Sequence, residues 1–186
     1  MKIGILSDSH GQCKALARAF DLMADADFIV HAGDILYHPP RLYGYEDYDV
    51  IKCVELINSL KVPFISVRGN CDSEVYTELM PGYAERETTV AGVSPYKIVV
   101  NHGTRLNTAA MISLAKDCRA EIFVSGHTHV PVLEKRDGVT LINPGSTGIH
   151  RYPSADPVPT ACIIEDGKAS IFDIWSEKVF FEAELL

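Results

Sequence analysis

Short apolar runs alternate with amphipathic stretches in the first third of the chain. Continuous aliphatic runs at 2–7, 28–31 and 64–67 predict buried strands. Between them, 13–23 and 50–60 place apolar residues at i, i+3 and i+4, which predicts helices. Alternating strands and helices are typical of right-handed crossovers that join parallel strands. This part of the chain therefore predicts an α/β fold.

The second half of the chain is richer in strands. A helix is expected at 108–116, and the Asp137-Gly138 and Asp166-Gly167 pairs between apolar runs predict hairpin turns. The strands expected in this half are 86–93, 96–100, 122–125, 130–135, 139–143, 161–165, 169–175 and 179–183. We find no linker or internal repeat, and we interpret residues 1–186 as a single domain with mixed sheet topology.

Composition narrows the classes of function. The chain has 186 residues, 47% of them hydrophobic, and a formal net charge of −8. Such a charge argues against a long nucleic-acid footprint or an anionic membrane surface as partner. The five cysteines are widely spaced and include no CxxC pair, which favours reduced thiols. No apolar stretch is long enough to span a bilayer, so we expect a cytoplasmic protein.

Polar clusters follow five of the apolar runs. Their candidate ligand side chains are two carboxylates, four imidazoles and one carboxamide, which is the donor set of a site for two metal ions. The clusters are Asp8-Ser9-His10, Gly33-Asp34, Gly69-Asn70, Asn101-His102 and Gly126-His127-Thr128-His129. Because open α/β sheets place their sites beyond the carboxyl ends of strands, we expect these side chains to meet at one edge.

The spacing within the clusters suggests how the ligands are shared. If the backbone is extended, side chains at i and i+2 point the same way, so Asp8 and His10 would reach one ion, as would His127 and His129. We expect the carboxylate of Asp34 to bridge two ions. The second site would be closed by two further ligands, Asn70 and His102.

Oxygen and nitrogen ligands without a thiolate favour manganese, iron, zinc or nickel, and manganese is our first expectation. Two such ions would generate a bridging hydroxide for in-line attack and leave the site strongly positive. A phosphate ester suits that charge better than a peptide or a sugar does. We therefore expect a small phosphate ester as the substrate.

The series Asp8-x-His10, Gly33-Asp34, Gly69-Asn70, His102 and Gly126-His127-x-His129 resembles the calcineurin-like metallophosphoesterase superfamily. The Asn143-Pro144-Gly145-Ser146 turn is also similar to that family, and Gly69-Asn70-Cys71-Asp72 resembles its small YfcE-type phosphodiesterases. The resemblance implies a four-layer α/β/β/α sandwich, with two mixed β-sheets flanked by helices. It also implies two ligand sets: Asp8, His10, Asp34 and His129 for the first ion, and Asp34, Asn70, His102 and His127 for the second.

The expected activity is hydrolysis of a phosphodiester, with Asp34, Asn70 and His102 as the catalytic residues. In many relatives a histidine follows the asparagine and is proposed to protonate the leaving group. Cys71 occupies that position here, and a thiol is a weaker acid than imidazolium at neutral pH. Asn70, Cys71 and Arg41 are our candidates for contact with the substrate.

Three alternatives remain at this point. A phosphomonoesterase would use the same donor set. A non-catalytic scaffold would resemble the retromer subunit of eukaryotes, whose metal-site positions are altered, whereas every position here holds a competent ligand. A nuclease is disfavoured by the acidic charge. The irregular segment 35–49, rich in tyrosine, leaves a homo-oligomer open.

Overall fold

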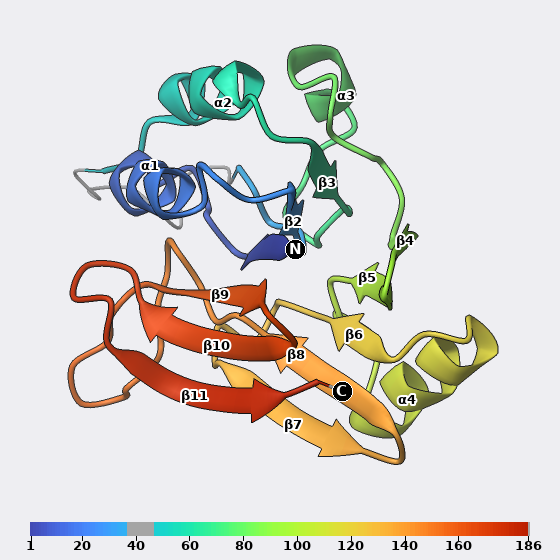
Figure 1. The fold of residues 1–186 in the computed structure, drawn as a ribbon. Coiled ribbons are helices and arrows are strands. Elements are labelled where there is room, and N and C mark those ends of the chain that lie inside the picture. Colours follow the sequence, from blue (N-terminus) through green and yellow to red (C-terminus); the bar gives the residue numbers. More distant parts are fainter. Residues whose placement is uncertain (37–46, 186) are drawn as a thin grey trace.

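A computed structural model describes residues 1–36 and 47–185, in which the strands form two sheets (Figure 1). The first sheet has six strands in the order β11-β10-β9-β1-β2-β3. Their bounds are β1 Lys2–Leu6, β2 Phe28–His31, β3 Phe64–Ser66, β9 Thr160–Glu165, β10 Lys168–Asp173 and β11 Val179–Glu184. β1, β2 and β3 are parallel, whereas β9 to β11 are antiparallel to their neighbours. The sheet is therefore mixed, as the sequence predicts.

Two helices connect the parallel strands of the first sheet. α1 (Cys13–Leu22) joins β1 to β2, and α2 (Val50–Ser59) lies between β2 and β3. The side chain of Asp49 caps α2 by accepting a hydrogen bond from the backbone N–H of Lys52. Both helices cover the outer face of this sheet (Figure 1). The crossover prediction for the first third of the chain is confirmed.

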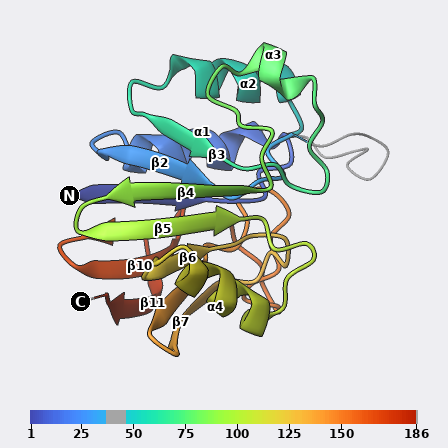
Figure 2. The ribbon, with the colours of Figure 1, turned by 90° about the vertical axis from the view of Figure 1, so that its right-hand side faces the viewer.

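The second sheet has five strands in the order β4-β5-β6-β8-β7. Its strands are β4 Thr88–Val93, β5 Tyr96–Asn101, β6 Ile122–Val124, β7 Val132–Arg136 and β8 Val139–Asn143. β5, β6 and β8 are parallel to one another, and β4 and β7 pair antiparallel at the two edges. Helix α4 (Thr108–Asp117) packs on the outer face of this sheet (Figure 2).

Three hydrophobic clusters hold these layers together. The central cluster lies between the sheets and includes Ile3 and Val30 of the first sheet with Ile98 of the second. An outer cluster packs α1 and α2 on the first sheet, and a smaller one packs α4 on the second. These contacts establish the four-layer α/β/β/α sandwich with two mixed β-sheets that the resemblance implied.

The sequence patterns miss one element and misplace several strand ends by one or two residues. α3 (Tyr76–Leu79) is a single helical turn, too short to show apolar periodicity. The expected strand at 169–175 ends at Asp173, whose carboxylate accepts hydrogen bonds from the Trp175 N–H and the Ser176 hydroxyl in a turn. None of the helices in the described ranges has the length and apolarity needed to cross a bilayer.

Candidate metal centre

The predicted ligands follow the carboxyl ends of parallel strands in both sheets. They are Asp8 and His10 after β1, Asp34 after β2, Asn70 after β3, His102 after β5, and His127 and His129 after β6. The backbone N–H of His127 donates to Asp8 Oδ2 at 3.0 Å and joins loops of the two sheets, and that of Gly126 donates to the carbonyl of His102 at 3.1 Å and joins two loops of the second sheet. The two sheets therefore share one edge at this site.

The ligand loops do not have the extended backbone expected for side chains at i and i+2. Asp8, His10, His127 and His129 have φ values of 55°, 50°, 69° and 60°, in the left-handed region. The expectation of extended geometry is therefore wrong, although the paired side chains still converge. Asp and His tolerate this region better than most residues. The backbone N–H of His10, held by the carbonyl of Asp34 at 3.0 Å, helps to fix the strained loop.

Five of the predicted ligands form a buried cluster. Asp8 Oδ1 lies 3.2 Å from His129 Nε2, and Asp34 Oδ2 lies 3.3 Å from His102 Nε2. His10 Nε2 is 3.2 Å from His129 Nε2. Two sets of donor atoms fall within 4.8 Å of one another, Asp8–His10–His129 and Asp8–Asp34–His102. The structure thus brings together the residues assigned to the first ion, and two of those assigned to the second, Asp34 and His102.

The ring orientation of two histidines suits metal binding. His102 Nδ1 contacts the Ala32 carbonyl at 2.7 Å, and His129 Nδ1 contacts the Ile149 carbonyl. A carbonyl oxygen only accepts, so each Nδ1 carries a proton and each Nε2 faces the cluster, where it can bind a cation once it is deprotonated. Asp8 Oδ1 and His102 Nε2 are buried without a hydrogen-bond partner in the described structure. Such oriented, unsatisfied donor atoms fit a divalent cation.

The electrostatics of the metal-free cluster follow from burial and opposite charge. Burial alone would raise the pKa of Asp8, but the nearby imidazoles of His10, His129 and His102 outweigh it and hold that pKa well below its usual value. Burial would lower the pKa of His102, but Asp34 and Asp8 raise it to about 9. The cluster therefore holds a proton on His102 where a cation would otherwise bind.

Asn70 and His127 lie at the rim of the cluster. The Thr104 hydroxyl donates to Asn70 Oδ1 at 3.2 Å, and Asn70 Nδ2 donates to Cys71 Sγ at 3.1 Å. The rings of His127 and His102 are 5.3 Å apart. Burial, then the charge of His102, lowers the pKa of His127. Both rim residues line a cavity of about 690 Å³ above the cluster, together with Cys71.

Cys71 also approaches the cluster directly. Its backbone N–H donates to Asp34 Oδ1 at 2.7 Å. Its sulfur belongs to a third set of donor atoms, with His10 and Asp34, within 4.8 Å of one another. This position agrees with the predicted contact between Cys71 and the substrate. Arg41, the other candidate for substrate contact, lies outside the described residues.

Sequence reasoning did not assign a role to Asp72, which links two ligand loops. Its Oδ2 accepts from the backbone N–H of Asp34 at 2.8 Å and of Gly69 at 2.9 Å, and its Oδ1 accepts from Ile35 at 2.9 Å. Burial, with the charge of Asp34, raises the pKa of Asp72 to about 6 despite these bonds. The sequence feature that could have indicated this role is the position of Asp72, two residues after the predicted ligand Asn70.

His31 supports the cluster from beneath, as a buried histidine outside the ligand set. Its Nδ1 accepts from the Gly33 N–H at 3.2 Å, so its Nε2 donates to the Ser9 hydroxyl at 2.5 Å. Burial lowers the pKa of His31 to about 3, which keeps the ring neutral. His31 therefore connects the loop that carries Asp8 to the loop that carries Asp34.

The Asn143–Ser146 turn holds the remaining loop in place. Asn143 Nδ2 donates to the Gly126 carbonyl at 2.7 Å and to Thr128 Oγ1 at 3.1 Å. The Ser146 hydroxyl donates to the carbonyl of Asp8 at 2.8 Å. The turn thus supports the loop of His127 and His129 and also the loop of Asp8.

Comparison with known proteins gives consistent matches along nearly the whole chain. The model of the calcineurin-like phosphoesterase superfamily domain matches residues 1–166. Phosphodiesterase YfcE of Escherichia coli strain K12 is 34% identical over 151 residues, covering 80% of each chain. The solved structure of the E. coli phosphoesterase Yfce has a TM-score of 0.88 at 28% identity, covering 100% of both chains. Vps29 from Entamoeba histolytica, solved with zinc, shares the fold with a TM-score of 0.66, at 20% identity and 100% coverage of both chains.

Proposed function

Because this chain belongs to the calcineurin-like phosphoesterase superfamily, we propose that it is a phosphodiesterase that works with two divalent metal ions. The observation that carries the proposal is the buried cluster in which Asp8 contributes to two triads of donor atoms, one with His10 and His129 and one with Asp34 and His102. Family membership and this donor set imply divalent metal ions as cofactors. Their number, and manganese as their identity, belong to the proposal.

In this proposal Asp34 serves both ions, since its Oδ2 lies 3.9 Å from His10 Nε2 and 3.3 Å from His102 Nε2. Asp8, His10, Asp34 and His129 would hold the first ion, and Asp34, Asn70, His102 and His127 would hold the second. When bound, the two ions supply a nucleophile at neutral pH and positive charge for the phosphoryl oxygens. The Asn70 amide, at the rim of the cavity and hydrogen-bonded to Thr104, would orient the phosphate above the cluster.

A phosphomonoesterase with the same donor set is the second candidate, and the open cavity of about 690 Å³ favours the diester because it leaves room for a second ester group. A scaffold like the retromer subunit receives less support. Every predicted ligand position of this chain holds a side chain able to bind metal, and the likeness to Vps29 is one of fold alone. We further propose a cytoplasmic location, a small-molecule substrate, and no role in binding long nucleic acids.

The sharing of Asp34 is tested by metal content. Asp34→Ala should lose both ions and lower turnover of a chromogenic phosphodiester by roughly a hundredfold or more. His102→Ala should chiefly empty the second site, because His102 contributes to one triad only. Elemental analysis after gel filtration measures both variants beside the wild type. An Asp34→Ala protein that keeps two ions and its activity would overturn the proposed mechanism.

A further inference from the structure

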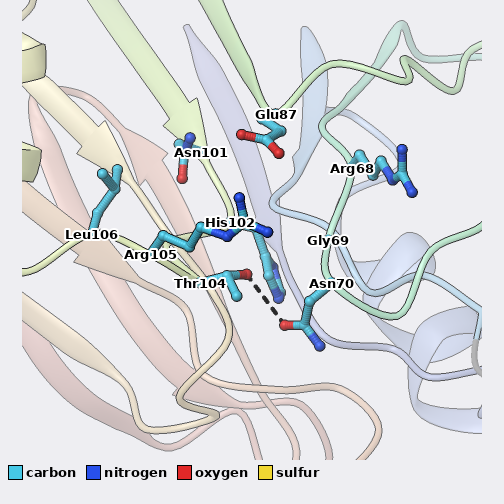
Figure 3. A pocket seen from close by; sticks show the side chains of 9 residues that line it. All are labelled: Arg68, Gly69, Asn70, Glu87, Asn101, His102, Thr104, Arg105 and Leu106. Carbon is cyan, nitrogen blue, oxygen red and sulfur yellow. Dashed lines mark hydrogen bonds between the residues drawn. The ribbon is translucent and has the colours of Figure 1, made fainter.

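A second cavity adjoins the metal cluster on the side of the second ion. Its volume is about 290 Å³, near the lower end of the range for small-molecule sites. It shares Asn70 and His102 with the metal cluster, and the rest of its lining comes from residues near β3, β4 and β5. Figure 3 shows this lining, with His102 between the Arg105 side chain and Asn70. An ester group of a phosphate held at the cluster would be next to this space.

The walls of the cavity are fixed by hydrogen bonds. Asn101 Nδ2 donates to Thr88 Oγ1 at 2.8 Å, and Asn101 Oδ1 accepts from the Gly103 N–H at 2.8 Å. Across the cavity, the Thr104 hydroxyl donates to Asn70 Oδ1 at 3.2 Å (Figure 3). A cavity with fixed walls binds a ligand at lower entropic cost.

The charged side chains of this cavity differ in their pairing. Arg68 is held by Glu85 at 3.1 Å, and in Figure 3 its guanidinium points away from Arg105. Arg105 extends across the cavity toward His102, with the Glu87 carboxylate beyond it (Figure 3). Within the described structure, neither the Arg105 guanidinium nor the Glu87 carboxylate has an ion pair or hydrogen bond. The cavity therefore offers one exposed cation and one exposed anion, neither of them held by a protein partner in the described structure.

From this arrangement we propose that the cavity binds an ester group that carries both a carboxylate and an ammonium, as in the phosphodiester of a hydroxy amino acid such as serine. Arg105 binds the carboxylate, because a guanidinium matches that group with two parallel donors. Glu87 binds the ammonium. A dianionic group such as a second phosphate fits less well, because it would face the Glu87 carboxylate. This inference rests on the proposed phosphodiesterase function and specifies its substrate class.

The test uses four phosphodiesters that share one ethyl ester group. The second ester group is formed by the serine hydroxyl in one compound and is carboxyethyl, aminoethyl or propyl in the others. Calorimetric titration of the manganese-loaded protein gives each dissociation constant. Competition against hydrolysis of bis(p-nitrophenyl) phosphate gives the matching inhibition constants. We expect each charge to tighten binding about tenfold, so that the serine diester binds most tightly and the propyl diester most weakly.

Two variants assign the contribution of each charge. Arg105→Gln should remove the gain from the carboxylate and keep the gain from the ammonium, and Glu87→Gln should do the reverse. Arg136→Gln is the matched control, since Arg136 lies on β7, pairs with Glu134 and lines neither cavity, and it should keep both gains. Equal binding of the serine and propyl diesters, or an unchanged carboxylate gain in Arg105→Gln, would overturn the inference. Failure of the proposed function is distinct: the loaded protein would not hydrolyse bis(p-nitrophenyl) phosphate, whichever diester it binds in the titration.

Discussion

At the scale of single residues, the metal centre depends on the orientation and protonation of its rings. Backbone carbonyls hold the Nδ1 atoms of His102 and His129, which aims each Nε2 at a carboxylate. The neutral ring of His31 ties Ser9 to Gly33 beneath them. These contacts fix the donor atoms before a cation arrives, which lowers the cost of binding one.

The raised pKa of His102 predicts how metal affinity depends on pH. In the metal-free protein this pKa is raised from 6.5 to about 9, so the folded state binds the proton more tightly than the unfolded state does. The protonated ring therefore stabilises the fold fully below pH 6.5, and this stabilisation is lost as the pH rises to about 9. A metal ion needs the deprotonated Nε2. Affinity for Mn²⁺ should therefore rise through the same interval, by up to roughly tenfold per pH unit for one displaced proton.

Calorimetric titrations with Mn²⁺ in buffers of different ionisation enthalpy would count the protons released at each pH. Thermal unfolding should also show a widening difference between the loaded and the metal-free protein as the pH rises toward 9. An affinity that stays constant over this interval, with no protons released, would contradict the role given to His102.

At the scale of elements, the site depends on how closely the strand-end loops approach one another. Asp72 links the loop after β3 to the loop after β2 through three backbone N–H groups. These two loops approach closely at Gly69, where an added Cβ would lie 2.1 Å from Asp34 Oδ1 and 2.3 Å from the Asp34 backbone nitrogen. No side chain fits between these loops, so Gly69 is required for the position of Asp34.

Gly69→Ala should accordingly displace Asp34 and impair metal binding. We expect a loss of roughly 1–3 kcal/mol in the free energy of unfolding, as for other overpacked sites, and at least a tenfold loss of Mn²⁺ affinity. Gly92→Ala is the matched control, because a Cβ there would meet nothing within 4 Å. Denaturant unfolding and Mn²⁺ titration of both variants measure the two effects. Wild-type affinity in Gly69→Ala would show that this close approach does not govern the site.

At the scale of the whole molecule, the sequence predicted the helices and strands that show a local apolar pattern and the ligands that lie in a motif. The apolar runs of β1, β2 and β3 and the periodicity of α1 and α2 predicted the parallel crossovers, because each signal lies within one segment. The order of the motifs predicted the ligands that the structure brings together. The two-sheet sandwich itself came from the resemblance.

Features that depend on distant segments were not predictable in this way. The left-handed backbone at Asp8 and His10 is held by hydrogen bonds to the loop that carries Asp34, so local spacing suggested extended geometry instead. Arg105 and Glu87 line one cavity because the pairing of β4 with β5 brings the segments that carry them together. The sequence analysis did not identify either residue as a candidate for substrate binding.

The central claim is that metal ions held by this cluster hydrolyse a phosphodiester. The most direct test is to strip the protein of metal, measure hydrolysis of bis(p-nitrophenyl) phosphate and of p-nitrophenyl phosphate, and repeat both after adding Mn²⁺. We predict no turnover in the stripped protein, and diester hydrolysis that returns with Mn²⁺ and exceeds that of the monoester. If the protein binds Mn²⁺ at Asp34 and His102 and yet hydrolyses neither ester, the claim is contradicted.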